Sequence, residues 1–80
     1  MTDRKTGANP KTINGVTFQC FRTSIMRYQW RNGDGSLAAG RWANRDTYYA
    51  EVGGQRFDNR FRSLENAMRF AVEYNKRVIL

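Results

Sequence analysis

The stretch YYAEVGGQRF, residues 48–57, decides the fold, because it has the pattern of two strands joined by a two-residue turn. Glycine readily adopts the positive φ values that such a hairpin turn requires, which places Gly53 and Gly54 in the turn. The register that follows pairs residues across the two strands: Val52 with Gln55, Glu51 with Arg56, and Ala50 with Phe57.

Alternation along this hairpin separates an apolar face from a polar face. The apolar face carries Tyr48, Ala50, Val52, Phe57 and Phe61. The polar face carries Thr47, Tyr49, Glu51, Arg56, Asp58, Arg60 and Arg62. We therefore expect the apolar face to lie in the core, and the arginine-bearing face to meet water or a ligand.

A helix over about residues 64–76 is expected to cover the apolar face. Ser63 is a good N-cap, and Glu65 in the first turn suits the positive end of the helix dipole. Apolar side chains recur at helical spacing: Leu64, Ala67, Met68, Ala71 and Val72. The last residues, RVIL at 77–80, are compatible with a final strand or with a tail packed against the sheet.

Upstream of the hairpin, VTFQCFR (16–22) and IMRYQWR (25–31) are rich in the residues that favour strands. They form either two strands or one long bent strand. NGDGS (32–36) predicts a turn, and LAAGRWANRD (37–46) a loop or short strand. The expected fold class is α+β: an antiparallel sheet of three to five strands with one principal C-terminal helix packed on one face. This single domain spans residues 15–80, after a flexible basic arm at residues 1–14.

Charge points to an anionic partner. The 80 residues carry 14 Lys and Arg against 7 Asp and Glu, a net charge of +7. Eleven of the cations are arginines, whose planar fork suits phosphates and guanine edges.

Catalysis and cofactors are not expected. The chain has no His, and its single Cys20, in a strand pattern, is expected to be a small buried residue. Asn32, Asp34 and Ser36 have the spacing of a calcium loop, but Leu37 replaces the glycine that the loop requires. The glycines also miss the dinucleotide-binding spacing. We therefore predict a non-enzymatic protein without metal or cofactor.

No membrane partner is expected, since no apolar run approaches the roughly 18 residues of a membrane span. Residues 1–15 lack the apolar segment of a signal peptide. The protein is expected in the cytoplasm, with a bacterial host cell as the expected setting.

The candidate binding surface is the sheet face opposite the helix. We expect it to carry Arg27, Gln29, Arg31, Tyr49, Arg56 and Arg60, with Arg41, Arg45 and Arg62 at its margins. Such a face can enter the major groove of DNA, where Arg reads guanine and Gln reads adenine. Alternatively, Tyr49 can stack on the bases of a single strand.

Residues 48–74 resemble the AP2 DNA-binding domain of plants and phages. The matching residues are Ala50-Glu51-Val52 in a strand, then Phe61, Ser63, Glu65 and Ala67 at the start of a helix, with Ala71 and Tyr74 further along. The arm-type DNA-binding domains of some tyrosine integrases are similar. The resemblance implies DNA, rather than RNA, bound by the sheet face away from the helix through Arg27, Arg31, Arg56 and Arg60.

A second hypothesis belongs to another class of protein. In size and character the chain is similar to small accessory proteins of phages and mobile elements, among them anti-CRISPR inhibitors of host defence. Such a protein would dock on a nucleoprotein complex or an acidic protein surface through the same arginine face. A DNA-binding module should retard plain duplex DNA, with strong salt dependence. An inhibitor of this kind should bind its protein complex and ignore naked DNA at physiological salt.

Overall fold

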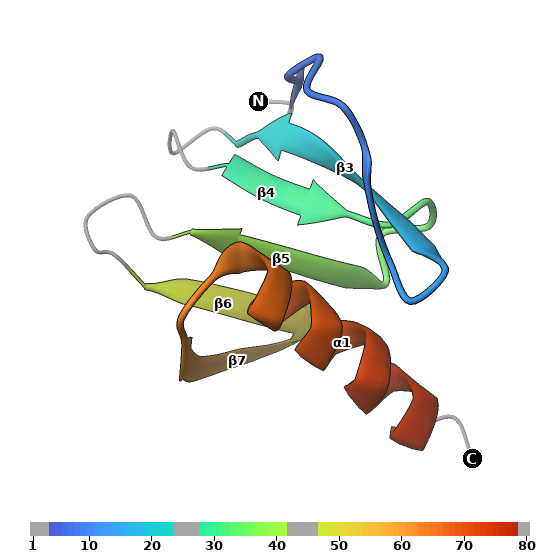
Figure 1. Ribbon diagram of the computed structural model, residues 1–80, viewed down its shortest axis with the longest axis vertical. Coiled ribbons are helices and arrows are strands. Elements are labelled where there is room, and N and C mark those ends of the chain that lie inside the picture. Colours follow the sequence, from blue (N-terminus) through green and yellow to red (C-terminus); the bar gives the residue numbers. More distant parts are fainter. Residues whose placement is uncertain (1–3, 24–27, 42–46, 79–80) are drawn as a thin grey trace.

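The structure, a computed structural model, describes residues 4–23, 28–41 and 47–78 (Figure 1). Its elements in chain order are β1 (Arg4–Lys5), β2 (Lys11–Ile13), β3 (Val16–Arg22), β4 (Tyr28–Arg31), β5 (Leu37–Arg41), β6 (Tyr48–Val52), β7 (Gln55–Phe61) and α1 (Leu64–Val78).

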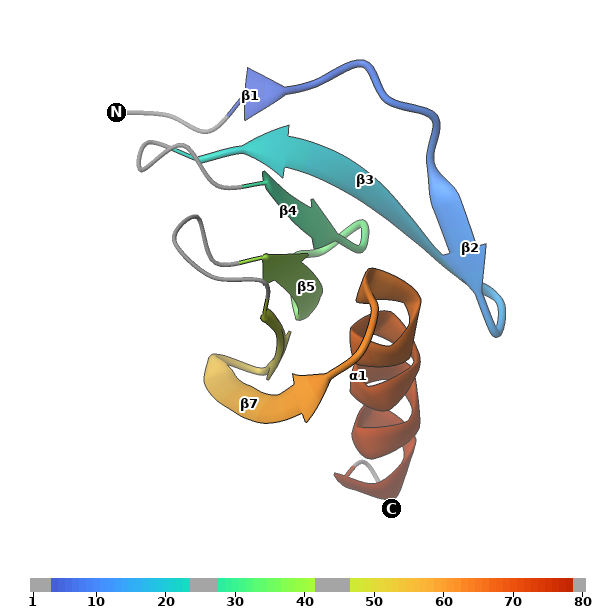
Figure 2. The same cartoon turned by 60° about the vertical axis from the view of Figure 1, so that its left-hand side comes forward.

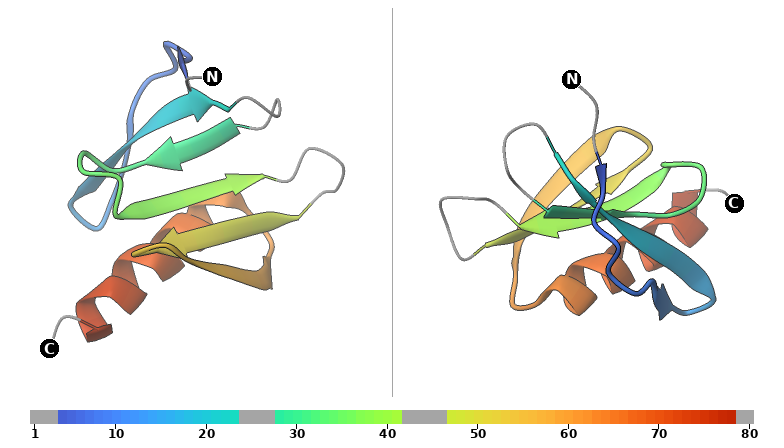
Figure 3. Two further views of the ribbon diagram at one scale, coloured as in Figure 1. Left: turned by 180° about the vertical axis from the view of Figure 1, so that it is seen from behind. Right: turned by 90° about the horizontal axis from the view of Figure 1, so that it is seen from above.

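These strands form one antiparallel sheet in the order β1-β3-β4-β5-β6-β7, with β2 also paired to β3. The α+β class is confirmed, and the C-terminal helix packs on one sheet face (Figures 1 and 3). The strand count was wrong: the described chain has seven strands, not three to five. Residues 16–22 and 28–31 are two strands rather than one, and residues 37–41 form a strand rather than a loop.

The additional strands come mainly from the segment expected to be a flexible arm. β1 and β2 both pair with the outer edge of β3. Asn14 and Gly15 form the turn between β2 and β3, with φ of 50° and 85°, the values that an Asn-Gly hairpin turn requires. Between β1 and β2, Gly7 has a φ of 84°, and Pro10 has no N–H to donate, so the ladder is interrupted there.

The β6–β7 hairpin has the predicted register: Val52 pairs with Gln55, Glu51 with Arg56 and Ala50 with Phe57. Gly53 and Gly54 form its turn, with φ of 56° and 88°. The pairing is irregular between Tyr48 and Ala50. Arg60, which has a φ of 55°, lies in the corresponding part of β7.

Helix α1 begins at the predicted cap. The Ser63 Oγ accepts a hydrogen bond of 3.1 Å from the backbone N–H of Asn66. Glu65 lies in the first turn, and Lys76 and Arg77 lie in the last, as the helix dipole favours. The helix extends to Val78, two residues beyond the predicted end, so residues 77 and 78 belong to it rather than to a strand or tail.

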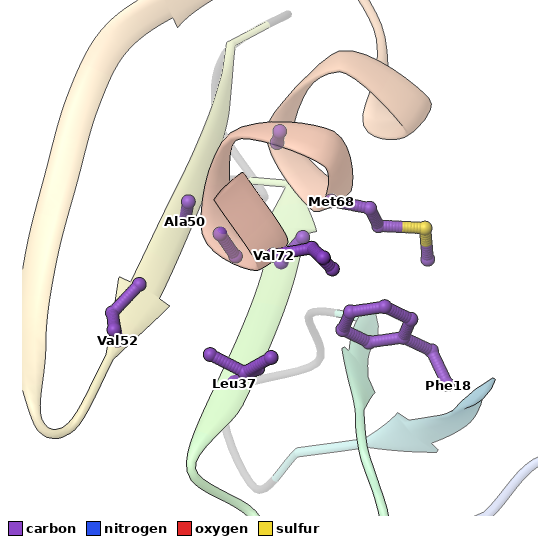
Figure 4. Close-up of a cluster of buried hydrophobic side chains, with 9 residues drawn as sticks. Phe18, Leu37, Ala50, Val52, Met68 and Val72 are labelled. Atoms are coloured by element: carbon purple, nitrogen blue, oxygen red, sulfur yellow. The ribbon is translucent and has the colours of Figure 1, made fainter. Parts of the chain in front are cut away.

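The core lies between α1 and the strands β3, β5 and β6 (Figure 4). Its fully buried side chains come from each layer, with Phe18 from β3, Ala50 from β6, and Met68 and Val72 from the helix. Leu37 and Val52 close it on the sheet side. The predicted apolar face of the hairpin is therefore confirmed as the face that the helix covers, and Cys20 is buried as expected.

The sheet curves, so that β2 and β7 approach the helix from opposite sides (Figure 2). Besides the apolar packing in the core, polar side-chain contacts join the β2–β3 hairpin to α1. Lys11 Nζ lies 3.2 Å from Glu65 Oε2, and Asn14 Nδ2 donates to Glu73 Oε2 over 3.1 Å. In contrast, β1 and the end of β3 with which it pairs lie away from the helix (Figure 2).

Candidate nucleic-acid interface

The sheet face opposite the helix carries four of the predicted site residues. The register places Gln29, Gly40 and Tyr49 in one row across β4, β5 and β6. The next row contains Arg31, Ala38, Glu51 and Arg56. The structure therefore brings Gln29, Arg31, Tyr49 and Arg56 together on one face, as the alternation predicted.

Tyr49, however, is not a stacking platform. Its side chain is fully buried, with an exposed fraction of 0%. The ring lies across Gly40, where an added Cβ would meet the Tyr49 Oη at 2.6 Å and the Cζ at 2.7 Å. The ring is thus buried between Gly40 and the Arg56 guanidinium, so no face of it is open to a base, and the prediction that it stacks on bases was wrong.

Gln29 is also buried, with an exposed fraction of 4%. Its Nε2 donates to Tyr49 Oη over 2.8 Å, and its Oε1 accepts from Arg31 Nε over 2.6 Å. Both ends of the amide are therefore engaged within the protein. The expectation that Gln29 reads adenine was wrong for this conformation, and the residue instead positions Arg31.

The two arginines of this face lie over aromatic rings. The Arg31 guanidinium is 4.9 Å from the centroid of Phe21, and that of Arg56 is 5.7 Å from the centroid of Tyr49. Arg56 also makes an ion pair of 3.5 Å with Glu51. Both side chains still reach the surface, Arg31 partly and Arg56 more fully.

The remaining predicted residues are dispersed. Arg41 is exposed and pairs with Tyr48, so its side chain belongs to the helix-side face of the sheet. Arg60 and Arg62 are exposed at the end of β7 and just before α1. Arg27 and Arg45 lie outside the described residues.

Charge is distributed unevenly over the sheet. The strands β1 to β5 contain six cations and no acidic residue: Arg4, Lys5, Lys11, Arg22, Arg31 and Arg41. β6, β7 and α1 contain four acids: Glu51, Asp58, Glu65 and Glu73. Acids of these later elements form the ion pairs with Lys11, Arg56 and Lys76. The basic half of the sheet is therefore the part built from β1, β3, β4 and β5.

An open groove of about 750 Å³ lies on this basic half, on the face opposite the helix. Its walls include Lys5, Gln19, Phe21 and Arg31. The turn that follows β4 closes one end, where Ser36 donates from its backbone N–H to Asp34 Oδ1 over 2.9 Å. That hydrogen bond lowers the pKa of Asp34. The carboxylate, ionised at neutral pH in any case, places a negative charge at this end of the groove.

The sequence prediction missed Tyr28, which has an exposed fraction of 53%. Tyr28 and Trp30 lie two residues apart in β4 and so share a sheet face, and Trp30 does pack against the core. Tyr28 lies one row further along that face, at the first residue of β4, and is not among the side chains that pack against the core. The extent of helix coverage is a tertiary property, so no local signal in the sequence marks this residue.

No family model, curated protein or solved structure matches this chain. The likeness to AP2 domains therefore rests on the residues quoted above. Within residues 4–23, 28–41 and 47–78, no helix is long and apolar enough to cross a membrane. In the same ranges, no three His, Cys, Asp or Glu side chains gather as a metal site would require.

Proposed function

We propose that this chain is a small, non-catalytic nucleic-acid-binding protein, and that the basic half of its sheet is the contact surface. One observation carries the proposal: the strands β1 to β5 contain six cations and no acidic residue, the acid between them being Asp34 in the β4–β5 turn. Lys5 and Arg31 lie on the face opposite the helix, and the other four cations lie on the helix-side face, so the cations surround this half of the sheet. A surface that only needs to be soluble gains from mixed charges, whereas a phosphate backbone favours cations of one sign gathered together.

Arginine-rich composition supports a phosphate ligand in particular. The guanidinium presents several N–H groups in a fixed fork that matches phosphate oxygens. Arg31 is oriented for this role, because the hydrogen bond to Gln29 and the ring of Phe21 hold its side chain at the groove. Each phosphate that the protein neutralises releases bound counterions, which makes affinity fall steeply with salt.

The resemblance to AP2 domains supports DNA over RNA. A phage or mobile-element origin is supported separately, by the small size and character that the chain shares with accessory proteins of phages and mobile elements. Of the residues to which it assigns DNA contact, Arg31 and Arg56 lie on the sheet face opposite the helix. Arg56 lies beside Glu51, which offsets its charge. We therefore assign the larger share of binding to the basic half of the sheet and a smaller share to the hairpin.

The test compares two variants with the same net charge. The first replaces Arg4, Lys5 and Arg22 with Gln, and the second replaces Arg69, Lys76 and Arg77 with Gln. Both lower the net charge from +7 by three, so a nonspecific charge effect would weaken both equally. Binding is measured by anisotropy of labelled DNA and RNA, single-stranded and duplex, over a series of salt concentrations.

We expect the sheet variant to bind much more weakly than the helix variant. On single strands, each phosphate contact contributes roughly 0.7 to the slope of log affinity against log salt. Removal of three cations should therefore make that slope shallower by about 2. Equal losses in the two variants would contradict the assigned surface. No salt-dependent binding by the unaltered chain would contradict the function itself and would favour docking on a nucleoprotein complex.

A further inference from the structure

We infer that the nucleic-acid ligand is single-stranded, and that Tyr28 is the platform on which one of its bases stacks. This inference rests on the proposed function and names the ligand class and the base-contacting residue. Tyr28 is at the start of β4, on the sheet face that the helix packs against, whereas the groove is on the opposite face of the same strands.

The Tyr28 ring is exposed and lies outside the core that the described residues form. Among the described residues, it is the large hydrophobic side chain that stands out as exposed, at 53%. Trp30 and Tyr48, which share its sheet face, both pack against the core cluster, whereas Tyr28 does not belong to that cluster. Packing in this core, as far as residues 4–23, 28–41 and 47–78 form it, therefore does not explain an aromatic ring at this position.

Cations lie on both sides of this ring. The register pairs Tyr28 with Arg22, and Arg22 with Arg4, so these three side chains lie on one face of neighbouring strands. Since Gln29 pairs with Gly40 in an antiparallel ladder, the next residue opposite Tyr28 on β5 is Arg41. Neighbouring strands are about 4.8 Å apart, so long arginine side chains flank the ring on either side. Arg4, Arg22 and Arg41 are all exposed.

This arrangement fits a single strand because two contacts can form together. A base that stacks on Tyr28 leaves the phosphates before and after it beside the flanking guanidinium groups. Stacking on an aromatic ring tolerates any base, because every base has a π-face. In a duplex the bases are already stacked on one another, and exposing one has an energetic cost. Tyr28 therefore distinguishes single strands from duplexes, and it does not distinguish one base sequence from another.

The test uses the full chain and three substitutions at one position: Tyr28→Ala, Tyr28→Leu and Tyr28→Phe. The probes are a short labelled oligothymidylate and a duplex of the same length, with affinity measured by anisotropy over a salt series. Tyr28→Ala should weaken single-strand binding by roughly 5- to 150-fold, the range for loss of one stacked base. Tyr28→Leu should behave like Tyr28→Ala, and Tyr28→Phe, which keeps the ring, should retain affinity. The salt slope should not change, because no cation is removed.

Because the ring is exposed, circular dichroism and thermal unfolding of all three variants should match the parent chain. Unaltered single-strand binding by Tyr28→Ala, with salt-dependent binding intact, would overturn this inference and leave the proposed function standing. Equal losses on duplex and single strand would also overturn it, since stacking requires an unpaired base. Absence of binding by the parent chain would overturn the proposed function as well.

Discussion

Gly40→Ala reports directly on how Tyr49 is buried. The φ of Gly40 is outside the positive range, so an alanine is compatible with the backbone. At such a position, Gly→Ala alone stabilises a protein by about 0.4–1 kcal/mol, because it restricts the unfolded chain. The new Cβ would nevertheless lie 2.6 Å from Tyr49 Oη, 2.7 Å from Cζ and 2.8 Å from Cε1.

The sign of the effect depends on whether the ring can move. The ring is fully buried, and its hydroxyl accepts the 2.8 Å hydrogen bond from Gln29. Overpacking costs about 1–3 kcal/mol, and a lost hydrogen bond adds about 0.5–1.5 kcal/mol. Against the entropic gain, we expect Gly40→Ala to lower the free energy of unfolding by about 1–3 kcal/mol. An 80-residue domain has only about 4–12 kcal/mol in total, so the effect is large.

Urea unfolding of the parent and variant chains, followed by circular dichroism, measures this change. Gly33→Ala is the matched control, because nothing lies within 4 Å of its added Cβ and its φ is also outside the positive range. In a Tyr49→Leu background, the cost of Gly40→Ala should largely disappear. A stabilising Gly40→Ala would refute the close packing of the Tyr49 ring on β5.

Three further outcomes follow from the contacts of the helix. Ser63→Ala should lower the free energy of unfolding by about 1 kcal/mol in urea titration, and an unchanged midpoint would show that the bond to Asn66 does not cap the helix. Phe57→Ala removes a ring whose centroid is 5.1 Å from that of Phe70 on the helix, and it should lower the free energy of unfolding by about 2–3 kcal/mol. This is less than the roughly 3–5 kcal/mol of a fully buried Phe, because Phe57 is only half-buried. The pKa of Glu65 is lowered from 4.5 by its own backbone N–H and then by Lys11. Its carboxylate therefore stabilises the fold above pH 4.5, and this contribution is lost as the pH falls through the lower, folded-state pKa. Glu65→Gln should reduce the loss of stability in acid, measured as urea midpoint against pH, and an identical pH profile would contradict the role of this carboxylate.

Local chemistry was sufficient to predict the C-terminal half of the fold. The Gly53-Gly54 turn sets the register of the hairpin, since shifting it by one residue would place Ala50 and Val52 on the polar face. Ser63 marks the start of the helix because its hydroxyl can accept a hydrogen bond from an otherwise unpaired N–H group. Both features depend on residues close in sequence, and both are confirmed.

The N-terminal strands were missed, although a signal for them exists. Asn14-Gly15 is the dipeptide typical of a tight hairpin turn, and Ile13 and Val16 flank it. Composition alone suggested a flexible arm, because residues 4–12 are mostly polar. Pairing with β3 and the contacts of Lys11 and Asn14 with the helix are long-range, so they could not be found from local pattern.

The polar face was predicted correctly in register but not in exposure. The missing side chain at Gly40 leaves room for Tyr49 to lie across β5 and reach Gln29 on β4. Alternation gives the side of a sheet on which a residue lies, and it does not say which side chains cover one another. The same limit hid Tyr28, which shares a sheet face with the packed Trp30 and is nevertheless exposed.

The most direct test of the account is the salt dependence of single-strand binding by the parent chain and by the Arg4, Lys5 and Arg22 triple variant. The account predicts a steep, linear loss of affinity with log salt for the parent chain, and a shallower line for the variant. Two parallel lines, with the same slope before and after these three cations are removed, would contradict the claim that the basic half of the sheet contacts the phosphates.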